Sequence, residues 1–470
     1  MKRYSPSPTP AQIWGGVYPV ANKDAKFSGG IGSKSSPIII DSAADLAQLS
    51  VNVANGIDYT GVYFELACDI YLNANAIDPC LVEGPGGENG QTDYPDTDVH
   101  QWTPIGGAGA GPVPPTSTES WGFAGHFDGC CHTIHNAFYN RQDGNVTDRD
   151  CNPHNLVGIF GSIWASGSLK NLNTEGGYIA AHISVGGIVG RTWGTIENCH
   201  NGNFVYSTGP HGAGGVVGAA YVQYASTPRG TIEARPSIDG CSNCATIVNN
   251  YISYNSGKKS GSAGGIVGEN EGNIINSWNT GNISCLLNAG GVIGSNQDQS
   301  SDGSVDIVPP GYINNCFNWG KVGSYTGCGI IPSTEAIYAG GILAYQTGSC
   351  QNVYSKGEVT ANGVDNASPA RPSAAGQIIG ELKAGSGEVN EELHYYSGFS
   401  PSIPPVGVVT DGSYSAAPFS NSSGSKDLLA GDLQEWVDEN QPGYLDWTQD
   451  EDEWPILEKS ACKRYRKNRK

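Results

Sequence analysis

The chain has 470 residues and a formal net charge of −20, from 45 acidic and 25 basic side chains. A surface this acidic repels phosphate, which argues against a nucleic-acid partner. Hydrophobic residues make up 38% of the sequence, enough for a packed core, and no apolar run reaches the roughly 18 residues of a membrane-spanning helix. The 67 glycines, about twice the usual share, predict a β-rich chain with many tight turns.

The N-terminal region is predicted to hold an arm and then a cap. Residues 1–37 form the arm. Residues 1–8 lack the apolar core of a signal peptide, so we expect either a piece of a larger exported protein or a chain kept inside a cell or virion. Residues 38–40 predict a strand, and residues 41–49 predict a capping helix with Ser42 as its N-cap. The alternating residues 63–72 predict one further strand.

Acidic insertions interrupt this first region, which extends over residues 38–156 and holds the cap and the first coils. Five aspartates in these insertions are candidate metal ligands: Asp93, Asp96, Asp98, Asp148 and Asp150. Carboxylates on glycine-rich loops suit calcium, which takes roughly six to eight oxygen ligands without strict geometry. No loop matches the twelve-residue calcium loop with its closing glutamate, so solvated acidic loops are the competing interpretation. Calcium is the one candidate cofactor.

A glycine motif repeats through residues 157–400. Gly-Gly-apolar-apolar-Gly units begin at residues 186, 214, 264 and 290, and weaker copies begin at 157, 340 and 375. The steps from 186 to 340 are 28, 50, 26 and 50 residues long, which indicates one unit with loop insertions. The long steps place extra chain at about residues 221–236 and 297–311. Insertions in a solenoid lie on one face, where binding usually happens.

A second motif, Ile-x-Asn-Cys-x-Asn-x-Gly, follows the first and is clearest at residues 313–322. Its first asparagine recurs in five copies and is expected to stack at one corner, interrupted by Asp239-Gly240: Asn171, Asn198, Asn276, Asn315 and Asn352. Its cysteines Cys199, Cys241 and Cys316 are predicted to be buried thiols and not disulfides.

Short Ile- and Val-rich segments between Gly and Asn corners, without a helical period, predict stacked strands. Such a pattern is typical of an all-β fold, a parallel β-solenoid in which each coil covers its neighbour. Residues 401–470 are expected to form a C-terminal cap and a basic tail. In that cap, residues 425–437 predict a helix, and Trp447 and Trp454 are expected to cover the last coil.

The order of these elements resembles the GLUG-motif repeat proteins over roughly residues 38–457. The matching segments are residues 41–49, 102–106, 127–134, the Gly-Gly units and residues 454–457. This family occurs in large bacterial surface and secreted proteins, including the non-catalytic N-terminal parts of some IgA-protease-like metalloproteases. The resemblance implies a right-handed parallel β-helix at the cell surface or outside the cell. It also implies a turn, and not a catalytic acid, at Asp128.

Aromatic residues at turns lead to a ligand hypothesis. Six are predicted to contact a glycan: Trp193, Tyr206, Tyr221, Tyr224, Trp278 and Trp319. Sugars stack on aromatic faces through their C–H surface, while Asn and Asp bond their hydroxyls. Trp164 also punctuates a turn. Trp278 and Phe317 share a repeat position, so packing within the protein is the competing interpretation.

No catalytic residue is predicted. A glycosidase on a β-helix would need two carboxylates on neighbouring coils. Glu175, Glu197, Glu358 and Asp239 lie in the second motif at different offsets, so no pair can be nominated. The His-Glu-x-x-His motif of zinc proteases is absent.

The sequence therefore predicts a non-catalytic surface adhesion scaffold. Its partners would be glycans, or other host or bacterial surface macromolecules, bound by the face that carries the insertions. A polysaccharide-degrading hydrolase or lyase on the same fold is the first alternative. A structural or receptor-binding protein of a virion is the second.

Overall fold

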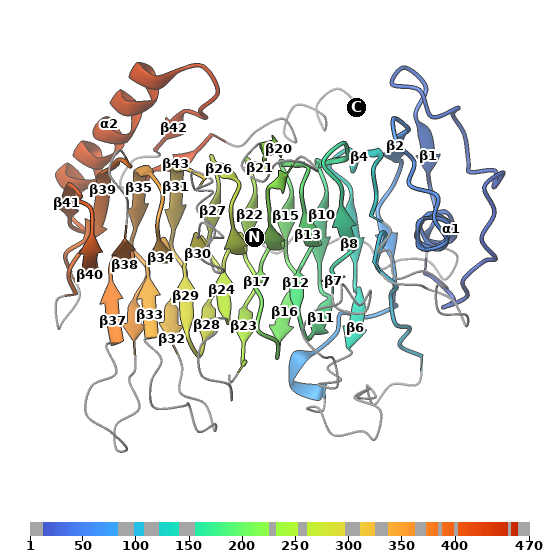
Figure 1. The fold of residues 1–470 in the computed structure, drawn as a ribbon, viewed down its shortest axis with the longest axis horizontal. Coiled ribbons are helices and arrows are strands. Elements are labelled where there is room, and N and C mark those ends of the chain that lie inside the picture. The colour runs from blue at the N-terminus through green and yellow to red at the C-terminus, as the bar shows by residue number, and fades with distance from the viewer. Residues whose placement is uncertain are drawn as a thin grey trace.

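Parallel strands stack along one axis into a β-helix in the computed structural model of the chain, as expected (Figure 1). The structure describes residues 13–82, 98–107, 122–140, 156–224, 232–251, 261–296, 311–324, 337–361, 373–383, 388–398, 403–449 and 453–458. Between residues 126 and 383, each coil visits four sheets in turn, here numbered 1 to 4.

Sheet 1 contributes one or two short strands to each coil. Its strands are β1 (Ile38–Ile40), β2 (Tyr63–Leu66), β3 (Ile70–Tyr71), β4 (His126–Asp128), β5 (Thr133–His135), β9 (Ser168–Lys170), β10 (Asn173–Glu175), β14 (Thr195–Glu197), β15 (His200–Asn201), β21 (Ser237–Asp239), β22 (Ser242–Asn243), β26 (Asn273–Ile275), β27 (Trp278–Asn279), β31 (Ile313–Asn318), β35 (Cys350–Ser355), β39 (Asn390–Tyr396) and β41 (Ala416–Phe419). The segment 63–72 is thus two strands of one sheet, β2 and β3, separated by residues 67–69.

Sheets 2, 3 and 4 complete the coil. Sheet 2 holds β6 (Phe138–Asn140), β11 (Tyr178–Ala181), β16 (Phe204–Ser207), β23 (Ile247–Asn249), β28 (Ile283–Cys285), β32 (Val322–Ser324) and β36 (Val359–Ala361). Sheet 3 holds β7 (Leu156–Val157), β12 (Ser184–Gly186), β17 (Ala213–Gly214), β24 (Ser262–Gly264), β29 (Asn288–Gly290), β33 (Ile337–Gly340) and β37 (Ser373–Gly376). Sheet 4 holds β8 (Phe160–Ile163), β13 (Val189–Thr192), β18 (Val217–Ala220), β25 (Val267–Asn270), β30 (Ile293–Asn296), β34 (Leu343–Gln346), β38 (Ile379–Lys383) and β40 (Val406–Asp411).

The Gly-Gly-apolar-apolar-Gly motif forms the corner between sheets 3 and 4. In its first clear copy, β12 ends at Gly186 and β13 begins at Val189. The last glycine of the motif lies where the two sheets touch. A Cβ on Gly190 would stand 2.3 Å from the backbone nitrogen of Val157, and one on Gly218 would stand 2.5 Å from that of Val185. The last glycine of the motif is therefore needed because the backbones of the two sheets pack directly against each other.

The asparagine column of the second motif is confirmed. Its five members all have φ between +53° and +57°, a left-handed conformation that asparagine tolerates. Their side chains bond from coil to coil, for example Asn198 Nδ2 to Asn171 Oδ1 at 2.5 Å and Asn352 Nδ2 to Asn315 Oδ1 at 2.8 Å. At the predicted interruption Gly240 takes the position with φ +63°, and Asp239 accepts the bond from Asn276 at 2.7 Å.

The core fills the space between the sheets and includes the predicted thiols. Cys199, Cys241 and Cys316 have no exposed surface and are free, so the prediction of buried thiols is confirmed. Cys131, by contrast, is disulfide-bonded. A second amide ladder, not foreseen from the sequence, is also buried: Asn201, Asn243, Asn279 and Asn318, joined Nδ2 to Oδ1 at 2.8 Å.

The N-terminal end is closed by helix α1 (Ala43–Ala54), as predicted (Figure 1). The hydroxyl oxygen of Ser42 accepts the backbone N–H of Asp45 and caps the helix. Leu46 and Leu49 have no exposed surface and cover the first coil. A short 3₁₀ helix, η2 (Pro79–Leu81), follows β3.

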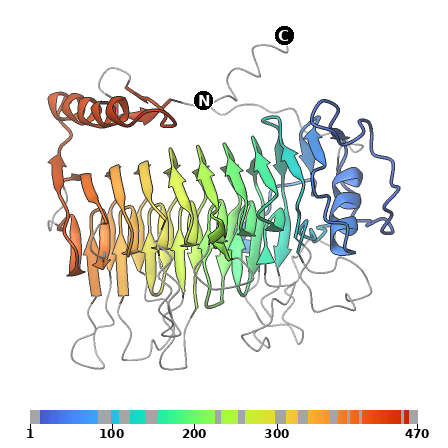
Figure 2. The same ribbon diagram turned by 45° about the horizontal axis from the view of Figure 1, so that its top comes forward.

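The C-terminal helix and tryptophans are present, but they lie along the side of sheet 1. Helix α2 (Ser423–Asn440) and the antiparallel pair β42 (Trp447–Thr448) and β43 (Ile456–Leu457) follow β41 (Figure 2). They cover an outward-facing aromatic row in which Trp278, Phe317 and Tyr354 occupy one register position. Trp447 Nε1 donates to Asn315 Oδ1 at 2.6 Å, which anchors the segment on the asparagine column.

Within the described part of the chain, no helix is long and apolar enough to cross a membrane.

Candidate functional site

Three aromatic side chains follow sheet 4 on successive coils and define a corner column: Trp164, Trp193 and Tyr221. Each comes directly after one of Ile163, Thr192 and Ala220, which are paired in register. The hydrogen-bond ladder continues into the column, with Trp193 N donating to Ile163 O at 2.9 Å and Tyr221 N to Thr192 O at 3.0 Å. Trp164 is 43% exposed, and the other two rings are half-buried.

Arg191 connects the rings of this column. Its Cζ lies 5.1 Å from the ring centroid of Tyr221 and 5.8 Å from that of Trp193. Its Nη2 donates to Ser184 Oγ at 3.2 Å, while its buried Nε has no hydrogen-bond partner among the described residues. A cation held against two aromatic faces stays rigid.

Glu269 is the carboxylate behind the column. It accepts hydrogen bonds from the Tyr221 hydroxyl and from His211 Nδ1, the latter at 3.3 Å. Burial opposes its ionisation, but the bonds from His211 and Tyr221 and the nearby charge of Arg191 outweigh burial and lower its pKa. Burial raises the pKa of Tyr221 well above its ordinary value, and the charge of Glu269 adds to this shift. The cluster therefore holds an ionised carboxylate beside a neutral tyrosine.

Glu271 lies one position beyond Asn270 of β25, in the coil after Tyr221. It is 5% exposed, and its Oε2 accepts the backbone N–H of Val222 at 2.9 Å. Burial raises its pKa to about 7, the charge of Glu269 adds to the shift, and the Val222 bond partly offsets it. This part of the cluster therefore takes up a proton near neutral pH.

The sequence predicted Trp193 and Tyr221 but not Arg191, Glu269 or His211. The signal for two of them was present, because Arg191 and Glu269 each directly follow the last glycine of a repeat motif. Their contacts with Tyr221 join side chains of neighbouring coils, and spacing in the sequence alone does not show such contacts.

The other predicted ligand residues lie elsewhere. Tyr206 is on β16 of sheet 2, where its hydroxyl accepts from Asn250 Nδ2 at 3.1 Å. Tyr224 is in β19 (Gln223–Tyr224), which pairs with β20 (Ile232–Ala234) beyond the corner column, and its side chain lies outside the described part. Trp278 and Trp319 pack against the C-terminal segment, and Trp319 Nε1 donates to Tyr354 at 2.7 Å. The five of these side chains that the structure describes do not form one surface.

The candidate calcium ligands remain a prediction. Asp93, Asp96, Asp148 and Asp150 lie outside the described residues, and Asp98 is exposed. No group of three His, Cys, Asp or Glu side chains suited to a metal occurs within the described ranges.

Two carboxylates that seemed offset in the sequence are in fact in register. Glu197 and Asp239 are direct partners on neighbouring coils, because β14 pairs with β21. Burial, with the nearby Glu197 charge, raises the pKa of Asp239, while the bond from Asn276 opposes this shift. No carboxylate pair could be nominated from the sequence, and the register of β14 and β21 now supplies one. Asp128, in contrast, is held by Cys130 N at 2.8 Å and Lys170 Nζ at 3.2 Å, in keeping with a turn.

No family model matches the chain. It is 33% identical over 175 residues to a putative Gly-rich membrane protein of Evansella cellulosilytica, and 28% identical over 190 residues to halomucin of Haloquadratum walsbyi. These matches include 37% and 40% of the chain but 15% and 2% of the relatives, so the chain spans only a small part of either one.

A solved structure covers nearly all of the chain. The crystal structure of a putative immunoglobulin A1 protease from Bacteroides ovatus aligns with 93% of this chain and 96% of its own, at a TM-score of 0.43 and 18% identity.

Proposed function

We propose that the chain is a surface-exposed β-helix scaffold of the GLUG-motif type that binds glycans along the corner column. The observation that carries the proposal is the column itself, with three aromatic rings on successive coils and one guanidinium between two of them. Coils of a parallel solenoid lie about 4.8 Å apart, close to the length of one sugar unit, so a glycan running along the axis would meet one ring per residue.

The chemistry of the cluster supports a saccharide ligand. Aromatic faces pack against sugar C–H surfaces, while Arg191 donates and Glu269 accepts hydrogen bonds to hydroxyls. Two long connections from sheet 4 to sheet 1 adjoin this corner, from β18 to β21 and from β30 to β31. A surface location is in keeping with the name of one relative, a putative Gly-rich membrane protein.

The test is a polysaccharide panel with purified protein, with calcium or with EDTA, in which pull-down scores binding. We expect Trp193→Ala to weaken binding roughly fivefold, since one ring contact contributes about 1 kcal/mol. Tyr414→Ala is the matched control, because Tyr414 is 39% exposed and follows β40, far from the column. Equal loss in both variants, or no loss in either, would refute the column as the site. Loss of binding in EDTA alone would show that binding depends on a divalent metal such as calcium.

A hydrolase is the second candidate, because Glu197 and Asp239 are paired on neighbouring coils. Mass spectrometry of the same mixtures separates the two functions. New oligosaccharides that disappear in Glu197→Gln would replace the binding proposal by an enzymatic one. The virion alternative is tested by mass in solution, where a stable trimer is its expected signature.

A further inference from the structure

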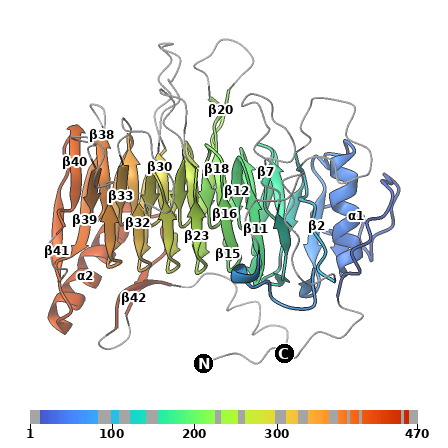
Figure 3. The same cartoon turned by 90° about the horizontal axis from the view of Figure 1, so that it is seen from below.

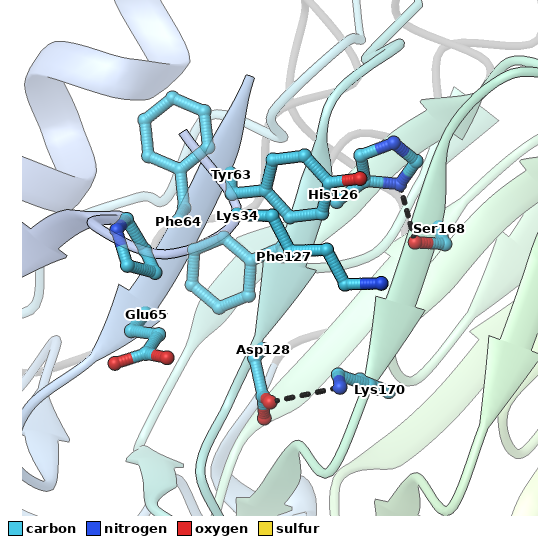
Figure 4. Close-up of a pocket in the computed structure, with 10 residues that line it drawn as sticks. Lys34, Tyr63, Phe64, Glu65, His126, Phe127, Asp128, Ser168 and Lys170 are labelled. Carbon is cyan, nitrogen blue, oxygen red and sulfur yellow. Dashed lines mark hydrogen bonds and ion pairs between the residues drawn. The ribbon is translucent and has the colours of Figure 1, made fainter. Parts of the chain in front are cut away.

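A pocket of about 400 Å³ opens on the outer face of sheet 1, near the N-terminal cap (Figure 4). Three neighbouring strands, β2, β4 and β9, form its wall. Tyr63, His126 and Ser168 occupy one register position across these strands, and Glu65, Asp128 and Lys170 occupy the next outward position. Because the six side chains stand on paired strands, the pocket is preformed.

One end of the pocket is an aromatic platform. The rings of Tyr63 and His126 lie 4.4 Å apart with 32° between their planes. His126 Nδ1 is 2.9 Å from Ser168 Oγ, which fixes the orientation of the imidazole. Below them, Phe64 and Phe127 are 1% exposed and belong to the core, so the platform rests on packed side chains.

The other end carries two lysines. Lys170 Nζ pairs with Asp128 at 3.2 Å, and Asp128 also accepts from Cys130 N and from Asn171 Nδ2, so its charge is met by three donors. Lys34 extends across Phe127 toward this end, while the Glu65 carboxylate points the other way (Figure 4). No carboxylate of the described ranges forms an ion pair with Lys34.

The pKa of the His126 imidazole reflects this positive potential. Burial lowers the pKa of His126, and the charges of Lys34 and Lys170 lower it further. Two cations beside a ring platform are unusual in a chain of net charge −20, whose overall field repels anions.

We infer that this pocket binds a carboxylate-bearing sugar, of the uronic acid class. The pyranose ring would pack on Tyr63, and the sugar carboxylate would lie between the ammonium groups of Lys34 and Lys170. A single negative charge fits better than a phosphate, because the charge of Lys170 already pairs with Asp128 and the two lysines cannot fully neutralise a dianion. The site is separate from the corner column, so it does not depend on the proposed function.

The experiment follows the ring signals of His126 by NMR, assigned with His126→Gln. Titration with glucuronate is expected to shift these signals and to raise the apparent pKa of His126, because the bound anion offsets the lysine charges. Glucose is expected to bind at least tenfold more weakly. Lys34→Gln should weaken glucuronate binding at least tenfold, while Lys23→Gln, at another exposed lysine of the arm, should leave it unchanged.

Three outcomes would overturn the inference. Equal binding of glucose and glucuronate would show that the pocket does not recognise the sugar carboxylate. Equal binding of acetate or inorganic phosphate would show an unspecific anion site. If glucuronate shifts none of the His126 ring signals, the pocket does not bind this sugar. Thermal unfolding of each variant shows whether a loss reflects binding or misfolding. Trp193→Ala should leave this titration unchanged, which separates failure here from failure of the corner column.

Discussion

Asn315 shows how one side chain can join coils to the C-terminal segment. Its Nδ2 donates to Asn276 Oδ1 and Leu445 O, and its Oδ1 accepts from Asn352 Nδ2 and Trp447 Nε1. It has no exposed surface, and its φ is +57°. Both the amide and the left-handed backbone are therefore needed at this position.

Replacing Asn315 separates these two needs. Asn315→Ala should lower the free energy of unfolding by roughly 3 to 5 kcal/mol, because it leaves buried partners unsatisfied and puts alanine at positive φ. Asn315→Gly keeps the backbone unstrained and should cost about 1 kcal/mol less. Denaturant unfolding measures both, with Asn440→Ala at the exposed end of α2 as control. If alanine and glycine cost the same, backbone strain has no part in the column.

Glu271 should make stability depend on pH. Its pKa is about 7 in the folded chain against 4.5 for the free side chain, so the folded state holds the proton more tightly. Its contribution is therefore favourable in acid and is lost as pH rises from about 4.5 to about 7, by roughly 3 kcal/mol. Glu271→Gln should remove this loss.

The measurement for Glu271 is the difference between the native protein and Glu271→Gln at pH 5 and at pH 8. Taking the difference matters because burial lowers the pKa of His394 to about 4, which gives a slope of the opposite sign. A difference that does not change with pH would show that Glu271 titrates normally.

At the scale of elements, the glycine of the sheet 3–sheet 4 contact sets how close two strands can come. A Cβ on Gly268 would stand 2.5 Å from the Cα of Gly212, where only backbone could move. Gly268→Ala should therefore destabilise the protein by roughly 3 kcal/mol or more. Gly431→Ala, in the exposed middle of α2 with nothing within 4 Å of the new Cβ, should stabilise it by about 1 kcal/mol. Thermal unfolding of the pair tests both signs, and a harmless Gly268→Ala would contradict the close contact.

Repetition explains which elements could be predicted. The asparagine column, the buried thiols and the glycine corners recur at fixed positions of the coil, so spacing in the sequence is also spacing in the structure. The route of the C-terminal segment was not predictable in this way, because α2 docks on a row formed by Trp278, Phe317 and Tyr354, whose outward direction appears only when coils are stacked. The contact of Tyr221 with Glu269 spans 48 residues and joins neighbouring coils, so it too needed the structure.

The whole molecule is asymmetric about its axis. Helix α2 covers one side, and the hairpin of β19 and β20 projects from the opposite side (Figure 3). The corner column and the pocket beside Lys34 and Lys170 lie on coils before Asn276, where the hydrogen bonds to the C-terminal segment begin. Both belong to the N-terminal half of the solenoid, and a single extended glycan would need to pass around the edge of the coil to reach the two.

The two ends of the solenoid also differ, and hydrogen exchange should reveal it. At the N-terminal end α1 covers β1, whereas at the other end β40 pairs with β38 and the described residues include no strand beyond it. Val409 is in register with the fully buried Leu382 but is 46% exposed, so the core is open at this last coil. In a repeat protein, stability comes from contacts between neighbours, so a coil with one neighbour opens first.

We therefore expect the amides of β40 to exchange much faster than those of β25, which has a strand on both sides, and faster than those of β1. Mass spectrometry of peptides after timed exchange measures this order. The last coil is its own control, because β41 in the same coil contacts α2 and buries Phe419, and its amides should exchange more slowly than those of β40. Protection of β40 equal to that of β25 would mean that the open end is covered in solution. Dilution would then show whether a second copy covers it, because protection by association falls with concentration and protection within one chain does not.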